Sequence, residues 1–492
     1  MSRGLVTASI MAATVMHALD MTIANVALPH MQGSLLATQD QISWVLTSYV
    51  VASAIMTPPT GILAARLGRK RFFQLSVAGF ILASMLCGIA SSLSEIVIFR
   101  ILQGGFGAAL IPVSQAILLD TYPRERHAQA MALWGVGVMV GPILGPTLGG
   151  YLTELYDWRW IFFINLPVGL IAMLGIAASV PETPRDPRRT FDLTGFALLT
   201  IGVGALQLML DRGELAGWFD STEIVIEATL AGLCFYGFIV HSVTVDRPFL
   251  DLALLRDRNF AIGVLLIFLI NLMMLATLAL LPAFLQNLLG YPIVETGFMM
   301  MPRGMGTMVA MLLVGRISGA IDARLIVTVG LLLTSFSMWE MSGFNLDVDE
   351  HAIIVTGMLQ GFGMGLIFSP LSAVTFSTLT AQLRTDGAAV FSLMRNLGSS
   401  IGVSVMTALL SHGRQLHRSH LVEHVTPFSP AFKDGDTFGL DTLAGLARLS
   451  AEISRQAEAL AYVGDFYKLM LVPLIPLPLL LILRPQSYGR LA

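Results

Sequence analysis

Charged residues are scarce in this chain, and cysteine is almost absent. Asp, Glu, Lys and Arg make up 12% of the 492 residues, while 55% are hydrophobic. A soluble domain carries about 25% charged residues, so this composition excludes one and predicts a protein that crosses a membrane many times. The two cysteines, Cys87 and Cys234, each lie inside an apolar run, so no disulfide framework is implied.

Long apolar runs predict an all-helical, polytopic membrane fold. About fourteen runs approach the ~20 residues that a helix needs to cross a bilayer. The predicted spans are residues 5–29, 44–65, 72–92, 96–119, 128–151, 160–180, 192–210, 223–243, 260–286, 295–315, 324–344, 352–378, 386–411 and 463–483.

Basic residues are distributed unevenly between the loops. They cluster from Arg66 to Arg71, between the second and third runs, and arginine recurs in alternate loops after that. The intervening loops 30–43, 287–294 and 345–351 contain neither Lys nor Arg. Since basic loops stay on the cytoplasmic side, we expect both termini to be cytoplasmic, which requires an even number of spans.

A weak internal repeat runs through the chain. The segment RILQGGFGAALIP at Arg100–Pro112 is echoed by GMLQGFGMGLIFSP at Gly357–Pro370. In the same way, GILAARLGRK at Gly61–Lys70 is echoed by GRISGAIDAR at Gly315–Arg324. Both offsets are roughly 255 residues, as expected for two similar six-helix halves separated by two extra helices.

The repeat sets the predicted domains. We expect an N-terminal six-helix bundle at 1–180, two linker helices with their cytoplasmic connections at 181–258, and a C-terminal six-helix bundle at 259–492. The last bundle includes a periplasmic loop at about 412–461, whose leucines recur at helical spacing between charged residues. This amphipathic helix is expected either to lie on the outer membrane interface or to dock a partner. The histidines of the loop favour a solvated surface over a metal site, and no metal is predicted.

Two charges lie inside apolar runs in the first third of the chain. Asp20 falls within 5–29 and Arg100 within 96–119. A charge at membrane depth costs roughly 2.5–3.5 kcal/mol, so such residues usually face a bundle interior and mark a functional site. The alternative is that they pair only to lock two helices together. Glu340, near the outer end of its run, is a second intramembrane carboxylate that either snorkels to water or contacts substrate.

Other polar residues inside the runs are candidates to line a substrate cavity, with hydrogen bonding between helices as the alternative. Gln103 lies one turn from Arg100 and is expected to orient it. Arg395 is expected to lock helices, and the methionines from Met299 to Met311 either suit a site that accepts many shapes or face lipid. The cavity candidates are His17, Asn25, Gln103, Gln115, Asn271, Arg303 and Gln360.

Glycine recurs at every fourth position in the fifth run. Such spacing makes a groove down one helix face that a neighbouring backbone can approach closely. Two prolines between the glycines remove backbone donors and permit bending. The groove predicts either tight packing alone or a pivot for rocking of the two halves. The residues are Gly137, Gly141, Pro142, Gly145, Pro146 and Gly149.

Several segments resemble motifs of a known family. GPILGPTLGG after GVGVMV resembles motif C of major facilitator superfamily antiporters, RILQGGFGAA resembles their motif B, and GILAARLGRKRF resembles motif A. LDMTIANVALP and WRWIFFINLPVG are similar to motifs of the fourteen-helix drug:proton antiporter subfamily, the EmrB/QacA type. The overall pattern looks most like the EmrB branch.

This resemblance implies a major facilitator fold and a gating role for the motif A residues Gly61, Arg66, Gly68 and Arg69. The chain departs from motif A at one position, because Ala65 replaces the usual acidic residue. Asp322 lies in the corresponding loop of the second half and is expected to take part in gating there.

The resemblance also implies a secondary transporter of the bacterial inner membrane that exports lipophilic compounds in exchange for protons, without a cofactor. Asp20 is expected to carry the proton and Arg100 to set its affinity, and Glu340 is a further candidate for proton coupling. EmrB-like members work with a periplasmic adaptor and an outer-membrane channel, so both are expected partners. The alternatives are a dedicated proton-coupled carrier of one metabolite on the same fold, and a membrane receptor or enzyme, which no nucleophile–base pair or metal cluster supports.

Overall fold

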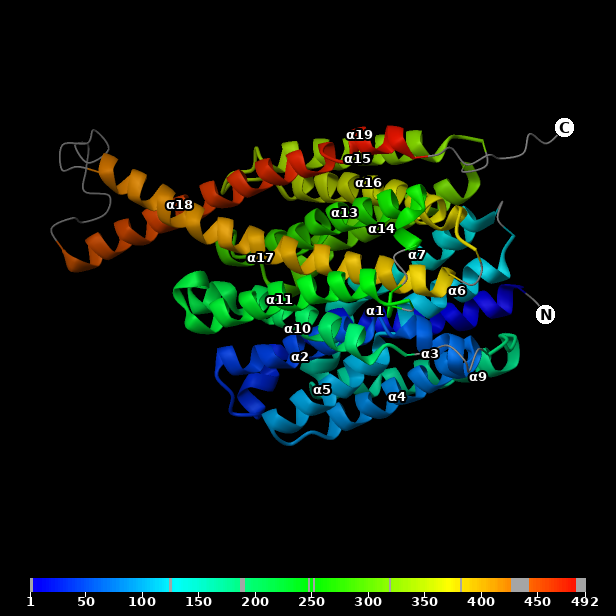
Figure 1. Ribbon diagram of the computed structural model, residues 1–492. Coiled ribbons are helices and arrows are strands. Elements are labelled where there is room, and N and C mark those ends of the chain that lie inside the picture. Colours follow the sequence, from blue (N-terminus) through cyan, green and yellow to red (C-terminus); the bar gives the residue numbers. More distant parts are fainter. Residues whose placement is uncertain are drawn as a thin grey trace.

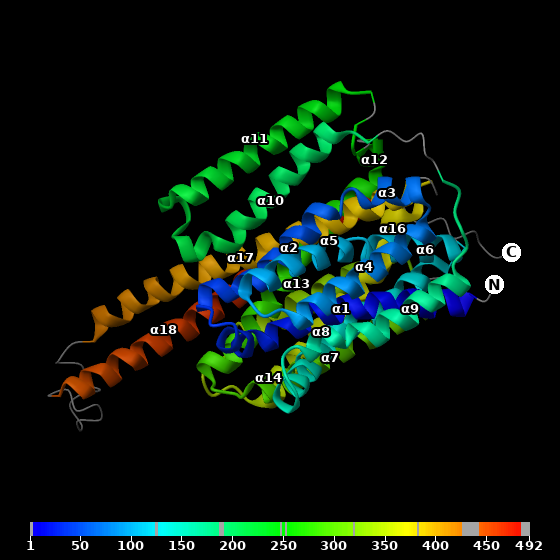
Figure 2. The ribbon, with the colours of Figure 1, turned by 90° about the horizontal axis from the view of Figure 1, so that it is seen from below.

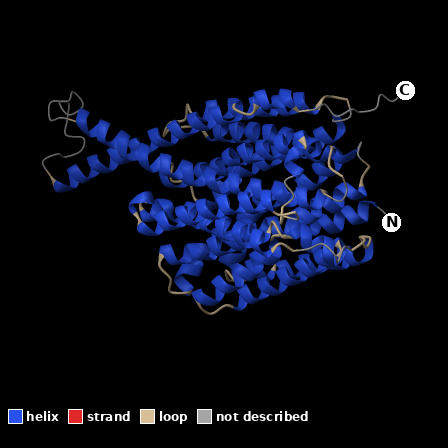
Figure 3. Ribbon diagram, viewed as in Figure 1, coloured by secondary structure: helices blue, strands red, loops and turns tan. Residues whose placement is uncertain are grey.

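The computed structural model describes residues 3–123, 126–185, 191–246, 248–250, 253–317, 320–380, 383–425 and 442–483. Within these ranges, the regular structure is helical throughout (Figures 1 and 3). The prediction of an all-helical fold is therefore confirmed. Most helices run side by side along one direction of the body, as expected for segments that cross a bilayer together.

The elements fall into the predicted order. The first six spans comprise α1 (Arg3–Ser34), α2 (Gln39–Met56), α3 (Thr60–Leu67), α4 (Arg69–Ile89), α5 (Leu93–Gly107), α6 (Leu110–Thr121), α7 (His127–Leu155), α8 (Trp160–Phe163) and α9 (Asn165–Ser179). The extra pair is α10 (Leu193–Ala216) and α11 (Thr222–Thr244), joined by η2 (Trp218–Asp220). The last six spans comprise α12 (Ala253–Arg256), α13 (Arg258–Ala283), η3 (Phe284–Leu288), α14 (Ile293–Ile317), α15 (Ala323–Met341), α16 (Glu350–Ser377), α17 (Arg384–His424), α18 (Leu443–Leu471), η5 (Val472–Leu474) and α19 (Leu477–Ile482).

The number of spans agrees with the prediction. Twelve helices in the described ranges are long and apolar enough to cross a membrane, or up to fourteen if two bent helix pairs each count as one span. One pair is α2 with α3, which meet at 59°. Pro58 and Pro59 lie at that break, where proline removes backbone donors and interrupts the helix. The other is α7, bent by 41° between Gly145 and Thr147.

The extra pair α10 and α11 lies on the outside of the body (Figure 2). Helix α10 packs against both α2 and α17. Ser400 of α17 donates a hydrogen bond to the Gln207 side chain at 2.9 Å, and Ser404 donates to the Leu210 carbonyl at 2.8 Å. These two hydrogen bonds connect α10 of the extra pair to the C-terminal half.

Of the two roles predicted for the amphipathic helix in the loop at 412–461, a position on the outer membrane interface is wrong, and docking of a partner stays a prediction. Helix α17 continues unbroken to His424 and α18 begins at Leu443, so the two last long spans project beyond the body as a helical hairpin (Figures 1 and 2). Arg418 of α17 donates to Ser450 of α18 at 3.3 Å. A helix paired with another in this way does not lie flat on the membrane. The tip of the loop, 426–441, lies outside the described residues.

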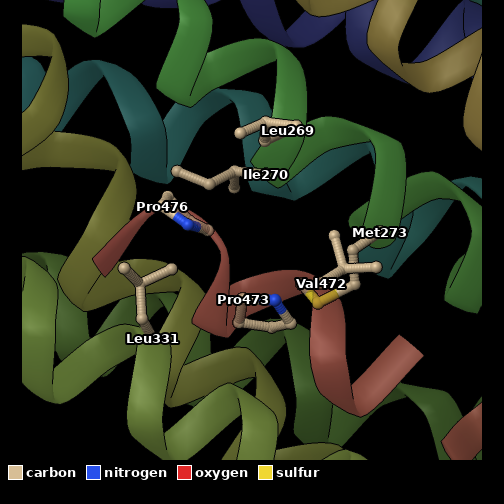
Figure 4. A pocket seen from close by; sticks show the side chains of 7 residues that line it. All are labelled: Leu269, Ile270, Met273, Leu331, Val472, Pro473 and Pro476. Carbon is tan, nitrogen blue, oxygen red and sulfur yellow. The ribbon is translucent and has the colours of Figure 1, made fainter. Parts of the chain in front are cut away.

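The last span is broken near its end. Pro473 and Pro476 interrupt the helix between α18 and α19, and a small gap remains where this break meets α13 and α15 (Figure 4). Its lining is wholly apolar, so it offers no group that would hold a proton or orient a polar substrate. The lining residues are Leu269, Ile270, Met273, Leu331, Val472, Pro473 and Pro476.

Candidate functional site

Asp20 lies at the centre of a buried polar cluster in the N-terminal half. Its side chain on α1 is fully enclosed. One carboxylate oxygen accepts a hydrogen bond from Arg100 Nη1 at 2.8 Å. The other accepts from Gln103 Nε2 at 2.8 Å and from Asn165 Nδ2 at 2.9 Å. Three donors from two other helices therefore hold this carboxylate away from lipid, as a buried charge requires.

Arg100 is held by more than the carboxylate. Its Nε donates to the Val45 carbonyl at 3.0 Å and its Nη1 also donates to Gln103 Oε1 at 2.8 Å. The guanidinium lies 4.1 Å from the centre of the Tyr49 ring, a distance at which an aromatic face attracts a cation. Gln103 thus lies between Arg100 and Asp20 and bonds both.

Two members of this cluster were not predicted. Asn165 opens α9 and donates both to Asp20 and to Ser84 Oγ, the latter at 2.9 Å. Tyr49 hydrogen-bonds the Nδ1 of His17 at 3.0 Å. A polar residue within an apolar run was the available signal for Asn165, because it stands between Ile164 and Leu166 in the segment WRWIFFINLPVG. His17, a predicted cavity residue, is buried against the rings of Tyr49 and Phe80.

The glycine groove of α7 receives α1. A Cβ added at Gly141 would overlap the backbone of Ala18, and one added at Gly145 would overlap the side chain of Thr22. Thr22 also donates to the Gly141 carbonyl at 2.9 Å. This close approach packs one face of α1 against α7. The face of α1 that carries Asp20 contacts α5 instead. Gly137 and Gly149 face α1 as well, while the side chains of Pro142 and Pro146 lie outside the described residues.

Predicted cavity residues of the C-terminal half lie apart from Asp20, and their hydrogen bonds are weak or local. Asn271 donates to the Ile267 carbonyl of its own helix at 2.9 Å, and Gln360 contacts the Met338 sulfur at 3.6 Å. Arg303 makes one long contact to the Met274 carbonyl at 3.4 Å. In the N-terminal half, Gln115 is buried and neither its amide nitrogen nor its oxygen has a partner.

Asn25 and Glu340 are exposed. Glu340 is the second-last residue of α15 and has no ion pair among the described residues. The structure therefore does not bring Glu340 to the Asp20 cluster. Its position at a helix end is compatible with both predicted alternatives, contact with water or with substrate.

The end of the bundle at which α1 begins, called the inner end below, carries a charge cluster between the halves. Asp120 of α6 pairs with Arg69 at the start of α4 and accepts from Arg384 Nη1 of α17 at 2.7 Å. A Cβ at Gly61 of α3 would overlap the carboxylate of Asp386, also on α17. Helices α6 and α3 of the N-terminal half therefore both contact α17 of the C-terminal half.

Two further contacts between the halves lie toward the same end, while Gly304 of α14 meets Ile143 of α7 near the middle of both helices. The ring of Trp134 on α7 stacks on that of Phe368 on α16, with centres 5.8 Å apart. Gly315, near the end of α14, faces Ala132 of α7 at 3.5 Å, measured from an ideal Cβ. Since α7 begins and α14 ends at the inner end, this conformation is closed there.

Three further predicted gating residues lie at helix ends or on the surface of the bundle. Gly68 separates α3 from α4 with φ of +86°, a value that favours glycine. Arg66 is exposed, and Asp322 caps α15 by accepting from the Arg324 backbone nitrogen at 2.9 Å. A helix cap accounts for an aspartate at that position. In the part of the chain that the structure describes, no three His, Cys, Asp or Glu side chains form a group that could hold a metal.

Comparison with known proteins decides the family. A family model described as Major Facilitator Superfamily matches residues 10–403. The chain belongs to the major facilitator superfamily. Its relatives include the multidrug export protein EmrB of Escherichia coli K12, 38% identical over 87% of this chain and 84% of that protein. The probable multidrug resistance protein EmrY of the same organism is 35% identical over 96% and 94%, respectively. The fatty acid resistance protein FarB of Neisseria gonorrhoeae is 38% identical over 88% of both chains.

Solved structures show the same fold. The human organic anion transporter MFSD10 aligns with a TM-score of 0.66 at 16% identity over 98% of this chain and 100% of that one. The proton:xylose symporter XylE aligns with a TM-score of 0.61 at 14% identity over 94% of both chains. The predicted family and fold are confirmed, and membership of the superfamily makes the chain a multi-pass membrane transporter.

The departure from motif A in this superfamily member now has a structural setting. Ala65 lies on α3 beside the closed inner end, where the usual acidic residue is missing. Two other carboxylates stand at that end, Asp120 opposite Arg69 and Asp386 opposite Gly61. The inner end therefore keeps acidic groups between the halves although motif A itself supplies none.

Proposed function

We propose that this superfamily member exports lipophilic toxic compounds across the bacterial inner membrane in exchange for protons. Multidrug export is the printed role of its EmrB relatives, which match most of the chain at 36–38% identity. Two helical halves that are joined by an ion pair at one end of the bundle suit transport by alternating access, in which a central site opens to one side at a time. The proposal places both termini in the cytoplasm.

The buried Asp20 cluster is the observation that supports proton coupling. In this conformation three donors hold the Asp20 carboxylate. Each hydrogen bond to a charged group contributes about 1.5–3 kcal/mol. A membrane potential of 100 mV moves one charge with about 2.3 kcal/mol. Proton uptake at Asp20 would remove its attraction to Arg100 and so weaken the contact between α1 and α5.

Substrate-induced proton flux in proteoliposomes tests this proposal. A pH-sensitive dye inside the vesicles reports protons released when a lipophilic drug is added. We expect wild type to show flux and Asp20→Asn to bind drug without flux, since asparagine cannot release a proton. Asp20→Glu, which keeps the carboxyl group, should retain part of the flux and shows that the site tolerates substitution. Drug transport by Asp20→Asn that still follows the pH gradient would refute the role of Asp20.

Glu340→Gln separates the two roles left open for the second carboxylate. If Glu340 only contacts water at the end of α15, proton flux should match wild type. A loss as complete as that of Asp20→Asn would add Glu340 to the coupling path. A changed drug preference with unchanged proton stoichiometry would instead make it a substrate contact.

The projecting hairpin supports an adaptor as partner, which in turn would lead to an outer-membrane channel. Helices α17 and α18 extend beyond the body and expose large apolar side chains, among them Val422 (51% exposed), Leu443 (88%) and Leu446 (51%). Exposed apolar side chains on a rigid projection suit contact with another protein. Replacing Leu443 and Leu446 by serine should abolish drug resistance in cells while transport in proteoliposomes, which needs no adaptor, stays unchanged. Equal loss in both assays would refute docking.

A dedicated carrier of one metabolite on the same fold is the second candidate function. The name of FarB, which refers to resistance to fatty acids, is its support. Growth of cells that express the protein, measured against a panel of toxic dyes and acids, separates the two. A dedicated carrier should protect against few compounds, whereas a multidrug exporter should protect against many that differ in shape.

A further inference from the structure

Besides the apolar gap of Figure 4, a polar pocket lies at the inner end of the bundle, where α1 begins (Figure 1). Its volume is about 250 Å³. That space is large for one or two water molecules, each of which occupies about 30 Å³ in the liquid. It is small for a drug-sized ligand, whose pocket has about 300–1,000 Å³. The pocket therefore has the size of a small ion or of a lipid headgroup.

Four segments supply the lining of this pocket. They are the beginnings of α1 and α4, the end of α6, and the end of α9 with the residues that follow it. Among the described residues, none of the lining comes from the C-terminal half, so the pocket is not part of a site shared between the halves. The polar lining residues are Arg3, Arg69, Asp120, Thr121, Ser179 and Thr183, and the apolar ones are Val6, Ile117, Val180 and Pro181.

Positive charge is in excess around the pocket. Asp120 is the carboxylate of the described lining, and it pairs both with Arg69 and with Arg384 of α17. One carboxylate cannot neutralise two guanidinium groups, which are always protonated. Arg3 adds a third and has no ion pair among the described residues. Even when Asp386, the other buried carboxylate at this end, is counted, three arginines stand against two carboxylates.

The hydroxyl groups of the lining are not equivalent. Thr121 and Ser179 each donate to a carbonyl one turn back in their own helix, both at 2.7 Å. Thr183 instead accepts from the backbone nitrogen of Arg69 at 2.8 Å, which leaves its own hydrogen to donate. The donors that the pocket offers are therefore two guanidinium groups and one hydroxyl. A phosphate group accepts from several donors at once, and arginine binds it with two parallel N–H···O bonds.

We propose that this pocket binds a phosphate group through Arg3, Arg69 and Thr183, either as a free anion or as the headgroup of an anionic phospholipid. The apolar part of the lining, such as Val6 and Val180, suits the carbon atoms of a phosphate ester. The site belongs to the N-terminal half alone and does not depend on what the protein transports.

Binding at Arg69 also acts on the contact between the halves. Asp120 divides its charge between Arg69 of its own half and Arg384 of the other half. A phosphate group on Arg69 would leave Asp120 to pair with Arg384 alone. That pair would become stronger, so the bound anion would stabilise the closed inner end.

A binding experiment with two arms tests the site and identifies the source of the phosphate. In the first arm, delipidated full-length protein in dodecyl maltoside, which carries no phosphate, is titrated by calorimetry with inorganic phosphate at constant ionic strength. In the second arm, the protein is mixed with equal amounts of phosphatidylglycerol and phosphatidylcholine, and native mass spectrometry counts the lipids that stay bound. Arg3→Gln and Arg69→Gln should each weaken binding about tenfold, because each removes a charge-assisted hydrogen bond.

A neighbouring arginine provides the matched control. Arg71 lies in the same turn of α4 as Arg69, pairs with Glu182 and does not line the pocket. Arg71→Gln removes one positive charge from the same end of the bundle, and it should change binding by less than about twofold because salt screens exposed charges. Arg3→Lys keeps the charge and should retain most of the binding. A melting temperature equal to that of wild type shows that each variant is folded.

The outcomes separate the two sources and the failure of the proposal. Binding of inorganic phosphate that depends on Arg3 and Arg69 identifies a free anion as the ligand. Retention of phosphatidylglycerol alone, with the same dependence, identifies a lipid headgroup. The proposal is overturned if neither arm shows binding, if the binding is the same without the two arginines, or if Arg71→Gln weakens it as much as Arg3→Gln does.

The effect on the inner end is measured with a cysteine at position 132, which is buried between α7 and α14. In a background without Cys87 and Cys234, a saturating amount of inorganic phosphate or phosphatidylglycerol, whichever binds, should lower the rate of alkylation about threefold. The same addition should leave the rate unchanged in Arg3→Gln. A rate that does not fall although the phosphate group is bound would refute the strengthening of the pair between Asp120 and Arg384.

Discussion

Replacing Asp120 by asparagine should open the inner end of the bundle. Asp120 is the acceptor that joins Arg384 of the C-terminal half to Arg69 of the N-terminal half. Asparagine has nearly the same shape but no charge, so it keeps the packing and removes the attraction between the halves. The equilibrium should shift toward the conformation in which the inner end is open.

The size of this shift follows from the burial of the three side chains. Asp120 is 31% exposed, Arg384 9% and Arg69 13%. An exposed ion pair contributes about 0–1 kcal/mol and breaking a buried one costs about 3–5 kcal/mol. For this half-buried cluster we expect about 1–2 kcal/mol, which corresponds to a change of about 5–30-fold in the equilibrium constant.

A cysteine at position 132 measures the open fraction. Ala132 is buried on α7 against Gly315 of α14, so Ala132→Cys should react with a maleimide only when the inner ends separate. In a background where Cys87 and Cys234 are replaced, Asp120→Asn should raise the alkylation rate by about 5–30-fold. Arg384→Gln should have a similar effect, and the two together should raise it less than the product of the single effects.

An ion pair that does not involve the C-terminal half provides the matched control. Arg71 lies in the N-terminal half and Glu182 in the segment just after it, and the two side chains pair at 3.1 Å. Glu182→Gln should therefore leave the alkylation rate at position 132 unchanged. If Asp120→Asn also leaves that rate unchanged, or if Glu182→Gln raises it equally, the idea that Asp120 holds the halves together is wrong.

Three further substitutions test the packing and the polar contacts. Gly141→Ala should force α1 away from α7 and lower the free energy of unfolding by about 1–3 kcal/mol, measured by thermal unfolding. Gly150→Ala should be neutral, because its new Cβ would meet its nearest neighbour at 4.0 Å. Equal effects of the two substitutions would contradict the packing of α1 in the glycine groove. Asn165→Ala should cost about 1–3 kcal/mol by leaving Asp20 one donor short, and an unchanged melting temperature would contradict that role. Burial alone would raise the pKa of Asp192, but hydrogen bonds from Gly195, His241 and Phe249 outweigh it and lower the pKa. Because the folded pKa lies below the unfolded one, this stabilisation is present above about pH 4 and is lost as pH falls through the folded pKa. Asp192→Asn should therefore lower the melting temperature at pH 7, and the difference from wild type should shrink as the pH falls below about 4.

Local sequence patterns were sufficient for the membrane spans and for one helix face. Apolar runs near the thickness of the bilayer gave the number of spans, because lipid leaves few alternatives to a helix of that length. The four-residue glycine period showed that α7 has a groove, since spacing on one helix depends on that helix alone. It did not show which helix fills the groove.

Other features depend on residues far apart in the chain. Asn165 meets Asp20 across 145 positions, and Arg384 meets Asp120 across 264. The amphipathic period before the last span fitted a helix on the membrane surface as well as one paired with α17, because both bury one face. Only the packing of α18 against α17 excluded the first arrangement.

The sequence by itself determined that this chain is a helical membrane protein of many spans, that it carries Asp20 and Arg100 within two of them, and that it resembles the major facilitator superfamily. The tertiary structure alone decided that these two charges touch, that Arg303 has no ion pair among the described residues, and that the bundle is closed at its inner end. The physical reason is that the hydropathy of a segment depends on its own residues, whereas pairing of charges depends on which helices become neighbours and how they are rotated.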